Sequence, residues 1–194
     1  IYKRDFLNKN NIRFLETPGA SYQDLGFTFK VFATAERVIL TDKAYLYYRQ
    51  DNMNSSVKSK TKVYCVCDEY TEIDKFLDER PDLKKEFKVQ EEIIRYTAYV
   101  SSALRIDDSF KPEFVEVFAK HFKTEYENGT LTDEFFKKIH KNEFLTLINN
   151  QKKYLKVLKN LEFRRKFNQI RKNFLSVHFR NGRLNVTLFG KEVI

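Results

Sequence analysis

The longest regular pattern in this chain is a helical one, which runs from about residue 62 to residue 149. Apolar residues recur there in alternating steps of three and four, the spacing that places them on one face of a helix. The first stripe consists of Val63, Val66, Tyr70, Ile73 and Leu77. Pro81, Pro112 and the Asn128-Gly129 pair interrupt the pattern where helices are expected to start or end. Together with the basic helical stretch at residues 151–173, the pattern predicts a helical domain over residues 61–173.

The segments on either side of this domain favour β-structure. In residues 1–60, runs rich in β-branched and aromatic residues alternate with two helical stretches. Three strands are expected there, at residues 11–15, 37–41 and 44–49. Near the C-terminus, Asn181-Gly182 separates two alternating runs, which is a strong signal for a hairpin. The predicted fold class is therefore α+β and predominantly helical, with an α/β segment at residues 1–60 and a β-hairpin at residues 174–194.

Composition places the chain among folded globular proteins. Hydrophobic residues make up 42% of the 194 residues, and no run approaches the ~18 consecutive apolar residues of a membrane-spanning helix. Cys65 and Cys67 lie too close in sequence for ordinary disulfide geometry, so they are expected to be free thiols in a reducing compartment. The three histidines, His121, His140 and His178, are scattered and form no recognisable ligand motif. No metal site is expected in these 194 residues.

The net charge of +9 is spread unevenly along the chain. Residues 1–60 carry 10 basic and 6 acidic side chains, and residues 61–150 carry 14 and 19. Residues 151–194 carry 12 basic and only 2 acidic side chains. A basic excess concentrated in one segment indicates contact with a polyanion or an anionic membrane surface.

The first candidate site is the run Tyr22-Gln23-Asp24, which follows a Gly-containing loop and opens a helix. An acid in the first turn of a helix commonly stabilises the helix dipole without any further role. Asp24 is also suited to act as a general base, because a helix start would hold its carboxylate in a fixed position. Both interpretations of Asp24 stay open on these residues alone.

The second candidate site is a polar cluster that follows the predicted strand at residues 44–49. A strand end running into a polar surface loop would account for it without a function. Alternatively, the cluster is an anion clamp, because the planar fork of Arg49 suits phosphate oxygens and neighbouring polar groups add further donors. The candidate binding residues are Tyr48, Arg49, Gln50, Asp51 and Ser55. No Gly-rich phosphate loop and no D-x-D motif accompanies them in the sequence.

Taken in order, these short motifs resemble the second half of a family-2 glycosyltransferase. The matching runs are YKRDFL (2–7), NIRF (11–14), YQD (22–24), FKV (29–31), YYRQ (47–50) and SS (55–56). Such enzymes are GT-A-fold, inverting transferases that build bacterial capsule and lipopolysaccharide chains. The resemblance covers residues 1–60, and it implies that these form a partial GT-A-like α/β segment on the acceptor side of a catalytic domain. Gln23 departs from the family's usual glutamate, and Asp51 stands where many relatives have histidine.

The resemblance also implies roles for the candidate residues. Asp24 would be the catalytic base, whereas Tyr22, Gln23 and the polar cluster from Tyr48 to Ser55 would bind the substrates, a nucleotide-sugar donor and a glycan or lipid-linked acceptor. The family's nucleotide-binding half, with a D-x-D motif for Mg²⁺ or Mn²⁺, would precede residue 1. These 194 residues alone are therefore expected to lack transferase activity and to need no cofactor of their own. Turnover of a donor sugar by this chain would contradict that expectation.

Two alternatives rest on the basic stretch at residues 151–173. A basic amphipathic helix is typical of a module that docks on anionic lipid, and such a module needs no catalytic activity. The same charge would suit nucleic acid, but no RNP, helix-turn-helix or zinc-finger pattern is present, so nucleic-acid binding is not expected. The helix could also pack in the core with a solvated basic face. The expected location is cytoplasmic, with peripheral contact to the inner face of the plasma membrane if the helix binds lipid.

Overall fold

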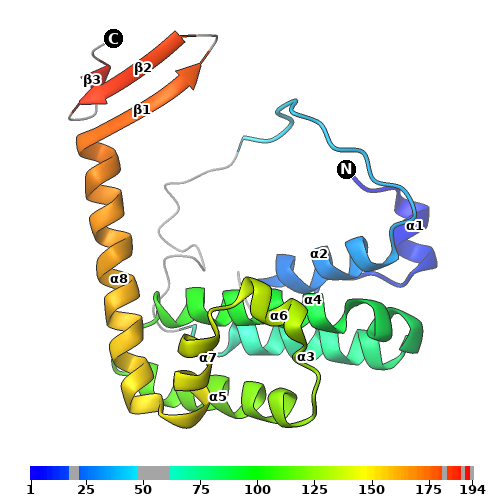
Figure 1. Cartoon of the computed structure of the whole chain (residues 1–194). Coiled ribbons are helices and arrows are strands. Elements are labelled where there is room, and N and C mark those ends of the chain that lie inside the picture. Colours follow the sequence, from blue (N-terminus) through cyan, green and yellow to red (C-terminus); the bar gives the residue numbers. More distant parts are fainter. Residues whose placement is uncertain (18–21, 48–61, 181–182, 189–190, 193–194) are drawn as a thin grey trace.

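The computed structural model describes residues 1–17, 22–47, 62–180, 183–188 and 191–192, with side chains described up to residue 168. A body of packed helices dominates it, and one long helix leads away from this body to a small sheet (Figure 1). The helices are α1 (Arg4–Lys9), α2 (Gln23–Thr34), α3 (Cys65–Asp78), α4 (Pro81–Ala103), α5 (Lys111–Glu127), α6 (Asp133–Lys138), α7 (Lys141–Asn149) and α8 (Gln151–Phe174). The strands are β1 (Leu175–Arg180), β2 (Arg183–Leu188) and β3 (Lys191–Glu192).

Local sequence signals set the helix ends. Pro81 and Pro112 lie in the first turns of α4 and α5, where a missing backbone N–H costs nothing. Gly129 ends α5 in the left-handed region, with φ of 74°. The N–H of Gly129 donates to the carbonyl of Tyr126, and the N–H of Thr130 donates to that of Glu125. This pair of hydrogen bonds is a Schellman cap, which favours glycine at the left-handed position.

Aromatic rings fill the centre of the helical body. Phe114, Phe118 and Phe122 project from one face of α5 and are completely buried. Tyr96 of α4 packs against them, with its ring centre 5.2 Å from that of Phe118 and 5.3 Å from that of Phe122. Tyr154 anchors the start of α8 on the same cluster. Because these rings come from three helices, the core fixes α4, α5 and α8 relative to one another.

Helix α2 lies on α3, and a smaller apolar cluster joins it to α1. Ile12, Phe27 and Val31 form the buried part of this cluster. Phe14 stacks on Phe27 with the ring centres 4.1 Å apart, although Phe14 itself is half exposed. The N-terminal residues are therefore held to the helical body mainly through α2.

The described parts of residues 1–60 do not form the predicted α/β segment. No strand forms at residues 12–17 or 37–47, which adopt irregular or extended backbone, and the remainder of the third expected strand lies outside the described residues. The predicted α+β fold class, with its partial GT-A-like segment, is therefore wrong: every regular element described before residue 175 is a helix. The physical reason is that a β-prone run needs a neighbouring strand to pair with its backbone groups, and the described part of the helical body offers none.

The strands that do form follow α8 at the end of the chain. β1 pairs with β2 in antiparallel register, with Leu175 opposite Leu188 and Arg180 opposite Arg183. β3 adds two residues on the other side of β2. The expected turn residues, Asn181 and Gly182, lie outside the described residues.

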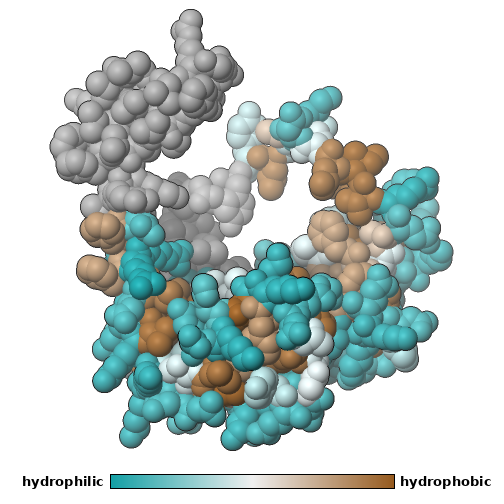
Figure 2. All heavy atoms as spheres, viewed as in Figure 1, coloured by the Kyte–Doolittle hydropathy of each residue, from teal (hydrophilic) through white to brown (hydrophobic). Residues whose placement is uncertain are grey.

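The surface of the helical body is mostly hydrophilic, with brown apolar residues beside the N-terminus (Figure 2). Within the extended segment 37–47, Ile39 and Leu40 are 92% and 88% exposed. None of the helices in the described ranges combines the length and apolar character needed to cross a bilayer.

Candidate functional site

Asp24 lies in the first turn of α2, and its side chain is exposed. Tyr22, the residue before the helix, adopts a left-handed backbone with φ of 67°, which turns the chain sharply into α2. Non-glycine residues occupy this region rarely, and such conformations persist only when the surroundings hold them. The carboxylate of Asp24 is therefore presented to solvent from a fixed helix start.

Tyr22 and Gln23 hold this helix start in place. The guanidinium of Arg105, which follows α4, lies over the ring of Tyr22 at 4.7 Å from its centre. Burial raises the pKa of the Tyr22 hydroxyl above its ordinary value, although the charge of Arg105 acts in the opposite direction. Gln23 donates from Nε2 to Oγ1 of Thr17 at 2.8 Å. These two predicted substrate-binding residues thus make intramolecular contacts that position Asp24.

The structure leaves the second candidate cluster undescribed. Tyr48, Arg49, Gln50, Asp51 and Ser55 all lie outside the described residues. Only Tyr22, Gln23 and Asp24 are therefore seen together, and the binding roles expected for the second cluster stay predictions.

A buried carboxyl group holds α2 against α3 close to Asp24. The backbone N–H of Gly26 donates to Oε2 of Glu69 on α3 at 3.1 Å. One turn further along, Lys30 pairs with Glu72 at 2.7 Å. A side chain at position 26 would place its Cβ 2.7 Å from Oε2 of Glu69, so the close approach requires glycine. Asp24 therefore stands two residues from a buried hydrogen bond that joins α2 to α3.

An apolar hollow of about 360 Å³ lies between α1 and the start of α2. Its lining includes Tyr2, Leu7, Phe14 and Phe27, together with Arg4 and Arg13. The hollow is open, and Tyr2 and Phe14 are each about half exposed. It would suit an apolar side chain from another segment better than a polar ligand.

A second group of ionisable side chains is buried between α3, α4 and α5. Arg95 of α4 pairs with Glu91 and with Asp74, each at 2.7 Å. Lys88 contacts Glu91 at 3.0 Å and Glu92 at 2.7 Å. Buried ions of opposite sign in direct contact offset part of the cost of removing each from water. The network fastens α3 to α4.

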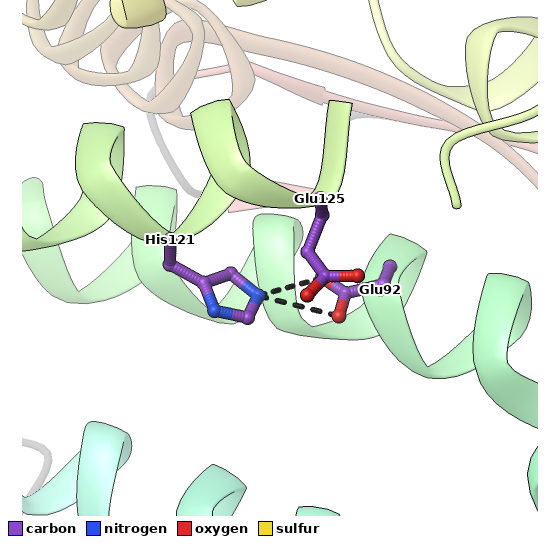
Figure 3. Close-up of side chains that lie close together, drawn as sticks. All are labelled: Glu92, His121 and Glu125. Carbon is purple, nitrogen blue, oxygen red and sulfur yellow. Dashed lines mark hydrogen bonds and ion pairs between the residues drawn. The ribbon is translucent and has the colours of Figure 1, made fainter. Parts of the chain in front are cut away.

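Glu92 extends this group toward α5, where it meets His121 and Glu125 (Figure 3). Nε2 of His121 lies 2.9 Å from Oε2 of Glu92. Burial alone would raise the pKa of Glu92, but the hydrogen bond from His121 and the charges of Arg95 and Lys88 lower that pKa to about 2. Glu92 is thus held ionised despite being fully buried.

The sequence interpretation missed this second site. His121 and Glu125 are four residues apart and so share a helix face, a spacing that was visible before the structure. Glu92 is 29 residues from His121 in the sequence, and only the packing of α4 on α5 brings them together. No sequence rule joins a lone histidine to a glutamate on another helix.

No family model, curated protein or solved structure matches this chain. Assignment of a function therefore depends on the motifs and contacts described above.

Proposed function

We propose that this chain contributes the acceptor side of an inverting glycosyltransferase. The enzyme would move a sugar from a nucleotide-sugar donor to a glycan or lipid-linked acceptor in capsule or lipopolysaccharide synthesis. One observation carries the proposal: in the ordered run of family-2 motifs, the residue matching the catalytic aspartate, Asp24, is exposed at a helix start that Tyr22 and Gln23 hold in place. A catalytic base needs both access to its substrate and a fixed position.

The proposed chemistry is a single displacement. The carboxylate of Asp24 takes the proton of the acceptor hydroxyl while the acceptor oxygen attacks the anomeric carbon of the donor. The bond from that carbon to the diphosphate oxygen breaks on the opposite face, so the configuration inverts and a nucleoside diphosphate leaves. Arg49 is proposed to face the leaving diphosphate. Mg²⁺ or Mn²⁺, held by a D-x-D motif that these residues do not supply, would neutralise its charge.

The uncovered apolar residues near the N-terminus support this proposal. Ile39, Leu40 and Tyr47 are almost fully exposed, and they lie in one extended segment. Contiguous exposed apolar surface commonly marks an interface. We propose that the nucleotide-binding part of the same enzyme covers this segment, and that Asp24 then borders the cleft between the two parts.

The test replaces Asp24 by Asn in an enzyme that joins these residues to their nucleotide-binding part. Loss of a general base typically costs about 10²–10⁴ in rate, so kcat should fall within that range while the melting temperature stays unchanged. Asp82→Asn is the matched control, because Asp82 is also an exposed acid in the first turn of a helix, α4. Full activity of Asp24→Asn with a panel of donor sugars would exclude Asp24 as the base.

We propose a second role, membrane docking, for the outer part of α8. Tyr154 and Leu158 bury the start of this helix in the core, whereas residues 163–168 are exposed throughout. Phe163 and Phe167 stack on each other there, with ring centres 6.4 Å apart. Arg164, Arg165 and Lys166 lie between them. Exposed aromatic rings beside basic residues suit the interface of an anionic bilayer.

Co-sedimentation with vesicles tests this docking role. Binding to vesicles with anionic lipid should exceed binding to neutral vesicles and should weaken with salt. Phe163→Ser with Phe167→Ser should reduce binding without lowering thermal stability, because both rings are exposed. Equal binding to neutral vesicles would contradict docking by charge, and tighter binding to single-stranded or duplex nucleic acid would favour a polyanion of that class instead.

A further inference from the structure

We propose that Glu92, His121 and Glu125 form a binding site for a divalent transition-metal ion, with Zn²⁺ as the preferred occupant. The site lies between α4 and α5, away from the start of α2, and it does not depend on the proposed transferase function. Its role would be to clamp the two helices together.

The geometry of the three side chains suits one shared ion. His121 and Glu125 are one turn apart on α5, and Glu92 faces them from α4 (Figure 3). One ligand atom from each residue lies within 4.8 Å of the others. Ligand atoms bonded to one tetrahedral Zn²⁺ at about 2.0–2.2 Å lie about 3.3–3.6 Å apart, so a closure of about 1 Å is needed. A small rotation of the Glu125 side chain would provide it.

The carboxylate of Glu125 also indicates that a cation binds here. Its carboxylate is half-buried and aimed at the Glu92–His121 pair (Figure 3). Among the described residues it makes no hydrogen bond or ion pair, unlike Glu91 and Glu92 beside it. A carboxylate that is partly removed from water and has no cation gains strongly from a nearby positive charge.

Two cations already lie at the edge of the site. Lys88 contacts Glu92 at 2.7 Å, and Nη1 of Arg95 lies 3.0 Å from Nε2 of His121. Both cations are shared with Glu91 and Asp74. With Glu92 and Glu125 included, four carboxylates face these two cations, which leaves an excess of carboxylates over lysine and arginine side chains. A divalent cation would balance that excess.

Arg95 also leaves the ring nitrogens of His121 accessible. Its Nη1 is 3.2 Å from Nδ1 and 3.0 Å from Nε2. Nη1 is thus nearly equidistant from the two ring nitrogens. In the plane of the ring, such a position would overlap the ring carbon Cε1. Nη1 must therefore lie over the face of the ring. The in-plane direction of Nε2, where Glu92 now accepts, is therefore open to a metal ion once the ring proton moves to Nδ1.

The ligand set selects the class of metal. One imidazole and two carboxylates suit Zn²⁺, whereas an all-oxygen set would favour Mg²⁺ or Ca²⁺. Three protein ligands leave at least one coordination position for water. Binding should weaken as the pH falls, because protons compete for all three ligands.

Calorimetric titration of the chelator-treated chain with Zn²⁺ tests the proposal. We expect one site, a rise in melting temperature on loading, and visible absorption bands when Co²⁺ replaces Zn²⁺. Glu125→Gln should weaken binding by more than about tenfold without altering the metal-free melting temperature, because the Glu125 carboxylate has no partner to lose among the described residues. Glu127→Gln is the matched control, since Glu127 is an exposed acid on the same helix, and it should bind as the unaltered chain does.

Two results would overturn the proposal. The first is the absence of a one-site binding curve with Zn²⁺ at neutral pH. The second is Zn²⁺ binding that Glu125→Gln leaves intact, because it would place the ion elsewhere, with the free thiols of Cys65 and Cys67 as the obvious ligands. His121→Ala should abolish binding, and Glu125→Gln keeps the test decisive if that variant does not fold.

Discussion

At the scale of single residues, Glu69 is a fully buried carboxyl group where α2 lies on α3. Oε2 accepts from Gly26, whereas Oε1 has no hydrogen-bond partner among the described residues. Burial raises the pKa of Glu69 to about 7, although the Gly26 N–H and the charge of Lys30 lower it; Asp24 and Glu72 raise it further. A raised pKa means that the folded protein binds this proton more tightly than the unfolded chain does. The stability that Glu69 contributes is therefore full below pH 4.5 and is lost as the pH rises through about 7.

We predict that Glu69→Gln removes this part of the pH dependence. Urea unfolding measures the free energy of unfolding at pH 5 and at pH 8. The decrease from pH 5 to pH 8 should be larger in the unaltered chain than in the variant, by roughly 1–3 kcal/mol. The amide of Gln still accepts from Gly26 but carries no charge to desolvate. Because all other titrating groups are shared, the difference between the two proteins isolates Glu69. An equal change in both proteins would show that Glu69 titrates normally in the folded state.

At the scale of elements, the contact between α2 and α3 depends on the missing side chain of Gly26. Gly26→Ala should improve the helix propensity of α2 by about 1 kcal/mol. It should also displace the Glu69 carboxylate and break a hydrogen bond to a buried charge, which costs about 1.5–3 kcal/mol. We predict a net loss of stability, measured as faster hydrogen exchange of the α2 amides. In a Glu69→Ala background the same change should stabilise α2, and a loss of equal size there would contradict the explanation.

The sequence pattern predicted some helices correctly and some strands wrongly. The helical pattern over residues 62–149 predicted α3, α4 and α5, and the stripe on α3 that contains Val66, Tyr70 and Ile73 is buried. The β-prone run at residues 37–41 was misread, because Val38, Ile39 and Leu40 form a strand only where another strand pairs with them. β-Propensity is a property of single residues, whereas strand pairing depends on a neighbouring strand that the sequence pattern does not reveal.

The candidate site at the start of α2 was also predicted only in part from the sequence. The position of Asp24 in a first helical turn followed from the local pattern, and the structure places it there. The contact of Tyr22 with Arg105 did not follow, because Arg105 lies after α4 and is far from Tyr22 in the sequence. Local chemistry is visible in a sequence, whereas contacts between helices depend on how they pack.

At the scale of the whole molecule, apolar side chains are buried in two separate clusters. The larger one spans α3 to α8 and is centred on rings such as Phe118, which is fully buried; only partly buried side chains of α2 pack against it. The smaller one consists of Ile12, Phe27 and Val31 and holds α1 to α2. Opening of a region costs less free energy when it buries few apolar contacts. The N-terminal helices should therefore open without the helical body unfolding.

Two matched substitutions test this division. Phe118→Ala removes a ring from the larger cluster and should lower the global unfolding free energy by about 3–5 kcal/mol, which speeds hydrogen exchange throughout α3 to α8. Phe27→Ala removes a ring from the smaller cluster, where it stacks on Phe14. It should speed exchange in α1 and α2 and leave α4, α5 and α7 protected. If Phe27→Ala instead destabilised the core of α5 as strongly as Phe118→Ala does, the two clusters would form one cooperative unit, and α2 would be integral to the fold of the helical body.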